Sequence, residues 1–174
     1  TSGASLVRQM PPSAETRIEP VPPDCGAADA FLRSARRFVS DGQNAGLSSE
    51  SRYALLYDGI HNATLAVLAA AGRRVTLGLG HHAKTIEEAG RLLGPESVEV
   101  IGRADSARRV RNRIQYETRE VSESQALAMI SDAETLLAMD TTYVRSHCCP
   151  ADAPATNPPT AVTKRRVSRP PPPR

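Results

Sequence analysis

The chain has 174 residues, of which 40% are apolar and only 3% aromatic, and it carries a formal charge of +3. Thirteen of its 14 prolines lie before Asp24 or after Cys149, which predicts one folded domain over residues 24–145 between two disordered Pro-rich arms, residues 1–23 and 146–174. No apolar run approaches the ~18 residues of a membrane span, and no basic start followed by an apolar stretch suggests a secretory signal, so a soluble, cytoplasmic protein without membrane contact is expected.

Two helices are predicted in the first half of this domain. Asp24 is a suitable N-cap, and apolar residues then recur at i, i+3, i+4 and i+7 as far as Gly42. A second helix begins near Ser48 and runs to Gly72, and it is apolar around so much of its circumference that it should be the central, buried helix. The segment that follows, RRVTLGLGHH, is predicted to be a connection.

Three further helices are predicted in the second half. The third is KTIEEAGRLLG, which ends at Gly94 before Pro95, and the fourth is VEVIGRADSARRVRNRIQYE. The fifth starts at a capping box formed by Ser122 and Gln125. No segment shows the alternation of a strand, so the predicted fold class is all-α, a bundle of four or five helices with short connections.

The fourth helix carries the most informative pattern in the chain. One of its faces is apolar and includes Val100, Ala104, Ala107, Val110 and Ile114. Arg103 and Arg111 fall on this same face. Because burying an unpaired charge is costly, such an arginine pairs with an acid, extends its head to water or faces a groove where a ligand supplies acceptors. For Arg111 a structural ion pair and a functional anion contact both remain open.

The remaining polar residues of the fourth helix lie on other faces. Arg108, Arg109 and Arg113 are predicted to point to solvent, as basic residues on a helix surface usually do. Asn112 and Tyr116 are four residues apart, so they share another side of the helix near its C-terminal end.

The histidines are weaker candidates. His61 lies at the edge of the apolar face of the second helix, with Asp58 one turn back, and a core or boundary histidine is the favoured interpretation over a catalytic one. His81 and His82 are adjacent, but no third ligand at metal spacing accompanies them. Neither a metal site nor a cofactor is therefore predicted.

The cysteines and the C-terminal arm suggest little further chemistry. Cys25, Cys148 and Cys149 form neither a CxxC pattern nor an even disulfide framework, so they are predicted to be reduced. Residues 146–174 hold five Lys or Arg against one acid, net +4, and residues 1–145 hold 17 basic and 18 acidic groups, net −1. The basic arm can attract RNA, DNA or acidic partners, but charge alone does not make the folded domain a nucleic-acid binder.

The last two predicted helices resemble part of a known family. Their sequence, RRVRNRIQYETREVSESQALAMISDAETLL, is similar to the end of bacterial HEPN domains (higher eukaryotes and prokaryotes nucleotide-binding), and LRSARRFV, YALLYDGIHNATLAVLAAAG and GHHAKTIEEAGRLLG fit the upstream pattern. The resemblance covers about residues 31–139. Active HEPN ribonucleases carry an R-x(4-6)-H motif, pair two protomers around a cleft and cleave RNA without a metal. Arg111 and Asn112 match the start of this motif, but Tyr116 stands in place of the histidine.

The tyrosine changes what the resemblance implies. A phenol, whose usual pKa is near 10, transfers protons poorly at neutral pH, whereas an imidazole is suited to it. The Arg-to-Tyr form resembles HEPN members that are non-toxic or accessory, which argues against ribonuclease activity. If the chain is an enzyme, the resemblance implies a metal-independent endoribonuclease.

The resemblance further implies a homodimer that binds RNA or a nucleotide phosphate in a stress, defence or toxin–antitoxin-like setting, with a nucleotidyltransferase or an antitoxin as partner. The site residues expected from it are Arg111 and Tyr116 as catalytic groups, Arg111, Asn112, Arg113 and Arg108 as phosphate or RNA contacts, and Asp58 and His61 as contributors from the second helix. The alternative is a catalytically inert interaction module, in which the same helix packs against a partner protein and Arg111 makes a structural ion pair.

Overall fold

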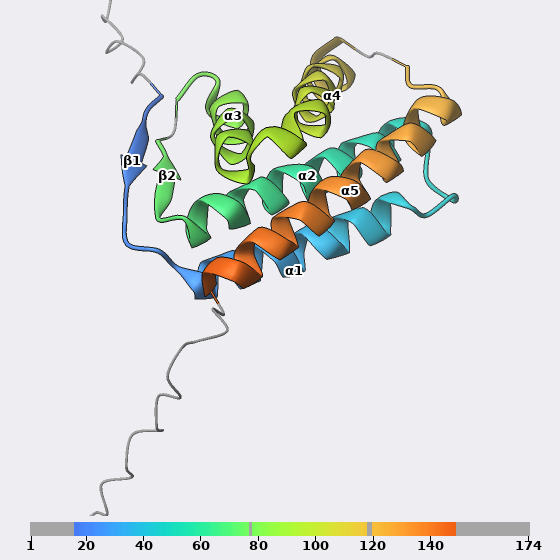
Figure 1. Cartoon of the computed structure of the whole chain (residues 1–174). Coiled ribbons are helices and arrows are strands. Elements are labelled where there is room, and N and C mark those ends of the chain that lie inside the picture. The colour runs from blue at the N-terminus through green and yellow to red at the C-terminus, as the bar shows by residue number, and fades with distance from the viewer. Residues whose placement is uncertain (1–15, 77, 118–119, 149–174) are drawn as a thin grey trace, which may run out of the picture.

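Five helices form the bundle in the computed structural model, which describes residues 16–76, 78–117 and 120–148. They are α1 (Cys25–Gly42), α2 (Ser49–Ala70), α3 (His81–Leu93), α4 (Val98–Glu117) and α5 (Glu123–Cys148), with a single 3-10 turn, η1 (Pro95–Ser97), before α4 (Figure 1). Two short strands, β1 (Ile18–Pro20) and β2 (Arg73–Val75), complete the described elements. The predicted all-α class is confirmed.

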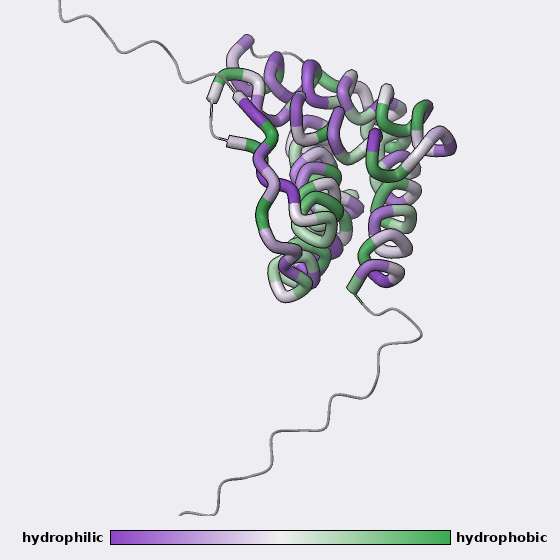
Figure 2. The backbone as a smooth tube through the Cα atoms, turned by 60° about the vertical axis from the view of Figure 1, so that its left-hand side comes forward, coloured by the Kyte–Doolittle hydropathy of each residue, from purple (hydrophilic) through white to green (hydrophobic). Residues whose placement is uncertain are grey.

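α2 is the central helix, as its composition predicts. It packs against the other four helices, and Figure 1 shows α3 and α4 above it. Leu56, Tyr57 and Ile60 of α2 are almost completely buried. Hydrophilic and hydrophobic segments alternate along the helices in Figure 2, as expected where one side of a helix faces the core and the other faces water.

Two of the predicted helix starts are confirmed by their caps. The Asp24 carboxylate accepts a hydrogen bond of 2.8 Å from the backbone N–H of Ala27 at the start of α1. Before α5, the Ser122 N–H donates to the Gln125 side chain at 3.0 Å, and the Gln125 N–H donates to the Ser122 hydroxyl at 3.2 Å. These reciprocal bonds form the capping box that the sequence indicates.

The expectation that no strand forms was wrong, and so was the extension of the N-terminal disordered arm to residue 23. β1 and β2 pair antiparallel, with Ile18 opposite Val75, and Glu19 makes an ion pair of 2.7 Å with Arg74. Strands of three residues are too short to show an alternating pattern. They form because residues far apart in the chain meet, which the local sequence does not record.

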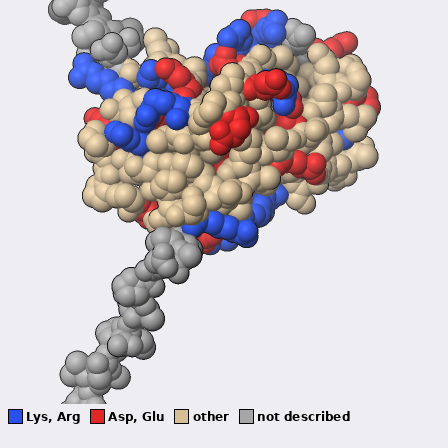
Figure 3. Space-filling model, viewed as in Figure 1, with Lys and Arg blue, Asp and Glu red and all other residues tan. Residues whose placement is uncertain are grey.

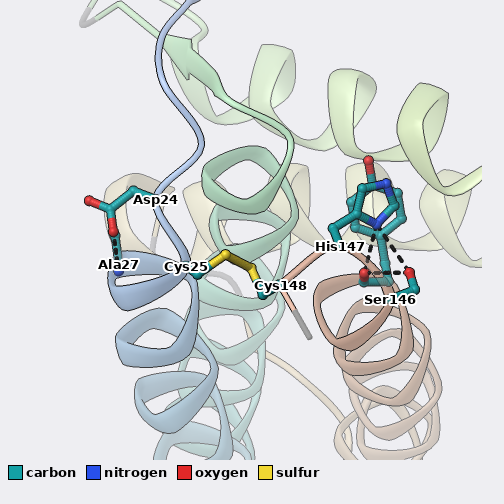
Figure 4. Close-up of a disulfide and its surroundings, with 7 residues drawn as sticks. Asp24, Cys25, Ala27, Ser146, His147 and Cys148 are labelled. Carbon is teal, nitrogen blue, oxygen red and sulfur yellow. Dashed lines mark hydrogen bonds between the residues drawn. A yellow bond between two sulfur atoms is a disulfide. The ribbon is translucent and has the colours of Figure 1, made fainter. Parts of the chain in front are cut away.

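The prediction of reduced cysteines was also wrong. Cys25 and Cys148 form a disulfide with their Cα atoms 5.5 Å apart, and Figure 4 shows it joining the first turn of α1 to the last turn of α5. The two residues are 123 positions apart, so only the bundle brings them together. α5 therefore extends beyond the predicted domain end at residue 145, whereas Cys149 lies outside the described residues.

The surface is charged but not uniformly basic. On the face shown in Figure 3, acidic and basic side chains are interspersed over a largely uncharged surface, and a basic group follows the edge formed by α1. The exposed arginines of α1 include Arg33, Arg36 and Arg37. Within the described part of the chain, none of the helices combines the length and the apolar character that crossing a membrane requires.

Candidate functional site

The apolar face of α4 lies where its spacing predicts. Val100, Ala104 and Ala107 are buried, and Val110 and Ile114 pack against the same core from partly buried positions. Arg103, predicted on this face, is instead half exposed and makes an ion pair of 2.7 Å with Asp132 of α5. Arg103 therefore extends its head group past the apolar contact and pairs at the edge.

Arg108 does not point freely into solvent as predicted. Its side chain is only 21% exposed, and its Nε donates a hydrogen bond of 2.9 Å to Asp105. Arg109, which is mostly exposed, pairs with the same carboxylate at 2.5 Å. Asp105 is thus shared by two guanidinium groups, and their hydrogen bonds and charges hold its pKa below the usual range although burial acts in the opposite direction.

Arg111 is partly buried and poorly paired. Its side chain is 26% exposed, it donates a hydrogen bond to Gln115, and the nearest carboxylate within the described residues, that of Asp58, lies 4.0 Å from Nη2. Arg52 shows the contrast: it is buried, it donates to a backbone carbonyl, and its Nη1 lies 2.5 Å from the Glu123 carboxylate. Since a guanidinium has five N–H donors, Arg111 keeps donors for a further acceptor.

Asp58 does not compensate Arg111 fully. Burial raises the pKa of the Asp58 carboxyl, and the charge of Arg111 lowers it less than burial raises it. A close ion pair would give the opposite balance. The interaction between the two groups is therefore a weak one.

Beside Arg111 lies a group of rings that we call the imidazole cluster: Tyr57, His61, His81 and His82. The rings of His61 on α2 and His82 on α3 are stacked, with centroids 3.9 Å apart and planes 9° from parallel. His81 meets His82 edge-on at 4.4 Å. The Tyr57 hydroxyl lies 2.9 Å from Nδ1 of His82. This hydrogen bond and these ring contacts tie the start of α3 to the middle of α2.

The stacked imidazoles are held in their neutral form. Burial, followed by the charges of His82, His81 and Arg111, lowers the pKa of His61 to about 3. The pKa of His82 is lowered by the same kind of causes, with burial first. Burial also raises the pKa of Tyr57, so its hydroxyl keeps its proton. We therefore assign the hydroxyl as the donor and the unprotonated Nδ1 of His82 as the acceptor.

The remaining nitrogens differ in their partners. Nδ1 of His81 lies 3.0 Å from the Gly78 carbonyl, so it carries the proton and donates. Nδ1 of His61 is buried and has no hydrogen-bond partner among the described residues. A buried nitrogen without such a partner is unusual in a folded protein.

The structure brings together some of the expected site residues and separates others. His61 belongs to the imidazole cluster, and Arg108 and Arg111 of α4 and Asp58 of α2 lie beside it. Asn112, Arg113 and Tyr116 are exposed on α4, and Tyr116 is 77% exposed.

Sequence reasoning missed Tyr57, His81 and His82 as members of one site. The four-residue spacing of Tyr57 and His61 places both on one face of α2, which is a usable signal. Nothing in the sequence connects them to His81 and His82. In the part of the chain that the structure describes, no group of three or more His, Cys, Asp or Glu is arranged to hold a metal ion.

No protein-family model matches the chain, and no curated protein matches it either. The HEPN resemblance therefore rests on the residues quoted above.

Proposed function

We propose that the chain is a HEPN-like helical protein that binds RNA or a nucleotide phosphate at Arg111. The observation that carries this proposal is the state of Arg111: three quarters buried, with one hydrogen bond to Gln115 and its nearest carboxylate 4.0 Å away. A guanidinium in this state favours a phosphate oxygen, which accepts two charge-assisted hydrogen bonds from it. Arg108, close to the same cluster, adds a second positive charge.

The proposal includes a homodimer in a stress, defence or toxin–antitoxin-like setting, with a nucleotidyltransferase or an antitoxin as partner. Two large apolar side chains near the site support an interface there. Leu79, just before α3, is 84% exposed, and Tyr116, in the last turns of α4, is 77% exposed. Cleavage of RNA is not part of the proposal, because Tyr116 stands in place of the motif histidine and is exposed.

The disulfide bears on the compartment in which this function operates. Disulfides persist in oxidising compartments and are rare in the cytosol. The Cys25–Cys148 bond therefore argues against the cytoplasmic location that the composition suggested. We propose an oxidising compartment, and alkylation of free thiols in intact cells followed by mass spectrometry tests this directly.

The test of RNA binding compares two arginine variants. Fluorescence anisotropy of a labelled single-stranded RNA is measured at low ionic strength with the native chain, Arg111→Gln and Arg37→Gln. Arg37 is an exposed residue of α1, which packs on α2 and α5, so its loss changes net charge equally without touching the site. We expect Arg111→Gln to lose most of the binding and Arg37→Gln to retain it. Absence of binding by the native chain would overturn the proposal.

The inert interaction module is the second candidate, and the contact between Arg111 and Asp58 favours it. In that case Arg111→Gln lowers the melting temperature or dissociates the dimer, because the residue serves packing alone. Circular dichroism melting and mass measurement in solution on the same variants separate the two candidates. A variant that melts and assembles normally but no longer binds RNA supports the phosphate site.

A further inference from the structure

We propose that anion binding at Arg111 is coupled to protonation of the imidazole cluster, so that the site holds a phosphate-like anion more tightly as the pH falls. This inference rests on the proposed function and adds a regulation to the same site. It follows from three observations: the stacked His61–His82 pair, its hydrogen bond to Tyr57 and the guanidinium groups that face it.

The first step concerns what surrounds the stacked pair. Its titratable and charged neighbours come from three helices: Tyr57 and Asp58 on α2, His81 on α3, and Asp105, Arg108 and Arg111 on α4. The two carboxylates do not offset the positive charges at the imidazoles, because Asp105 is engaged by two arginines and Asp58, 4.0 Å from Arg111, has its pKa raised by burial. Without an anion, protonation of an imidazole is therefore opposed by two guanidinium groups and by burial.

The second step concerns what an anion changes. A phosphate-like dianion bound to Arg111 places negative charge next to the cluster and reverses the repulsion that opposes protonation. Its presence therefore favours the protonated imidazole, and a protonated imidazole in turn favours the anion. This reciprocity is a thermodynamic requirement for any two linked ligands.

The third step identifies the atom that takes the proton. A proton from solvent binds Nδ1 of His82, and the imidazolium N–H then donates a hydrogen bond to the Tyr57 oxygen, which lies 2.9 Å away. The Tyr57 hydroxyl then accepts this hydrogen bond through its oxygen, and its own hydrogen turns away from His82. His61 remains neutral because two stacked imidazolium rings 3.9 Å apart would repel each other.

The test uses sulfate, which remains a dianion across the range in which imidazoles titrate. Its dissociation constant is measured by isothermal titration calorimetry at about pH 7.5 and about pH 5.5, in buffers of different ionisation enthalpy that report proton uptake. We expect tighter binding at the lower pH, by at most about tenfold per pH unit for one linked proton. We also expect sulfate binding to the native chain to be accompanied by a net uptake of protons.

Three histidine variants locate the linkage. His82→Gln should bind sulfate with little pH dependence, whereas His61→Gln should keep a pH dependence because His82 takes the proton. His147→Gln is the matched control: His147 stacks on Tyr143 at 3.9 Å near the end of α5, outside the imidazole cluster. Its variant should keep the native pH dependence.

Several results would overturn the inference. They are equal sulfate affinity at both pH values, absence of proton uptake by the native chain, a native pH slope in His82→Gln, or a slope lost in His147→Gln. The calorimetry on the native chain decides the matter even if a cluster variant fails to fold. RNA that binds through Arg111 with no pH dependence would remove this inference alone, whereas absence of RNA binding at every pH would remove the proposed function.

Discussion

Breaking the disulfide between Cys25 and Cys148 should lower the free energy of unfolding of the bundle by several kcal/mol. The bond joins residues 123 positions apart, so it closes a loop that spans nearly all of the described chain. In the chain-entropy model a closed loop of this size corresponds to about 5 kcal/mol, and removal of native disulfides costs about 2–5 kcal/mol in practice. When the bond is lost, the conformational entropy of the unfolded chain rises far more than that of the folded chain.

The folded state itself should change little. Near the disulfide, α1, α2 and α5 still share a buried apolar cluster that includes Ala28, Leu32 and Val144. Cys148 packs against this cluster, but the buried side chains at its centre come from other residues of the three helices. We therefore expect the reduced protein to keep its helical circular dichroism at low temperature and to unfold at lower urea concentration.

The assay is urea unfolding of the native chain with and without reductant, together with Cys25→Ser and Cys149→Ser. Cys25→Ser should match the reduced native chain, and Cys149→Ser should match the oxidised one, because Cys148 is the paired residue. Peptide mapping by mass spectrometry verifies the pairing. A difference below about 1 kcal/mol between the two variants would refute the entropic reasoning.

Two further substitutions test the interior. Asp140 of α5 is fully buried, neither of its carboxylate oxygens has a hydrogen-bond partner among the described residues, and burial raises its pKa well above the usual range. A carboxyl with a raised pKa in the folded state loses stabilising effect as the pH rises from its unfolded pKa, about 3.9, toward its folded pKa. Relative to the native chain, Asp140→Asn should therefore have a higher free energy of unfolding in urea at about pH 7 than at about pH 4. The same difference between variant and native chain at both pH values would contradict a protonated Asp140. At Gly59, where α1 and α2 come close, an added Cβ would lie 2.8 Å from Cγ2 of Val39. Gly59→Ala should lower the free energy of unfolding by about 1–3 kcal/mol. A Cβ added at Gly102 of α4 meets open space, so Gly102→Ala should leave the free energy of unfolding unchanged or raise it by up to about 1 kcal/mol. Similar effects at both positions would rule out the close approach.

The helices could be predicted because their signals are local. The Asp24 cap and the Ser122–Gln125 capping box are each decided within four residues, and the structure confirms both. The spacing of apolar residues likewise identifies the buried face of α4. It placed Arg103 and Arg111 on this face equally, yet Arg103 reaches Asp132 on α5 while Arg111 does not find a close carboxylate. Spacing gives the face of a helix, but the neighbouring helix decides how each arginine is paired.

The features that sequence reasoning missed are all non-local. β1 pairs with β2 across more than 50 residues, the disulfide joins the two ends of the domain, and His61 stacks on His82 from another helix. Each depends on how the helices pack, and packing is set by many small contacts that no single motif records. His82 illustrates this clearly: an adjacent histidine pair has no distinctive meaning until Tyr57 and His61 are placed beside it.

The disulfide and the candidate site depend on different helices, and this separates stability from binding. The bond joins α1 to α5, whereas Arg111 and the imidazole cluster belong to α4, α2 and α3. Loss of the bond acts mainly on the unfolded chain, and we expect the side chains that face Arg111 to keep their places. The oxidation state of the cysteines therefore sets the free energy of unfolding, while the charges around Arg111 determine what the folded chain binds. The disulfide and the anion site are therefore tested by separate measurements, unfolding for the one and binding for the other.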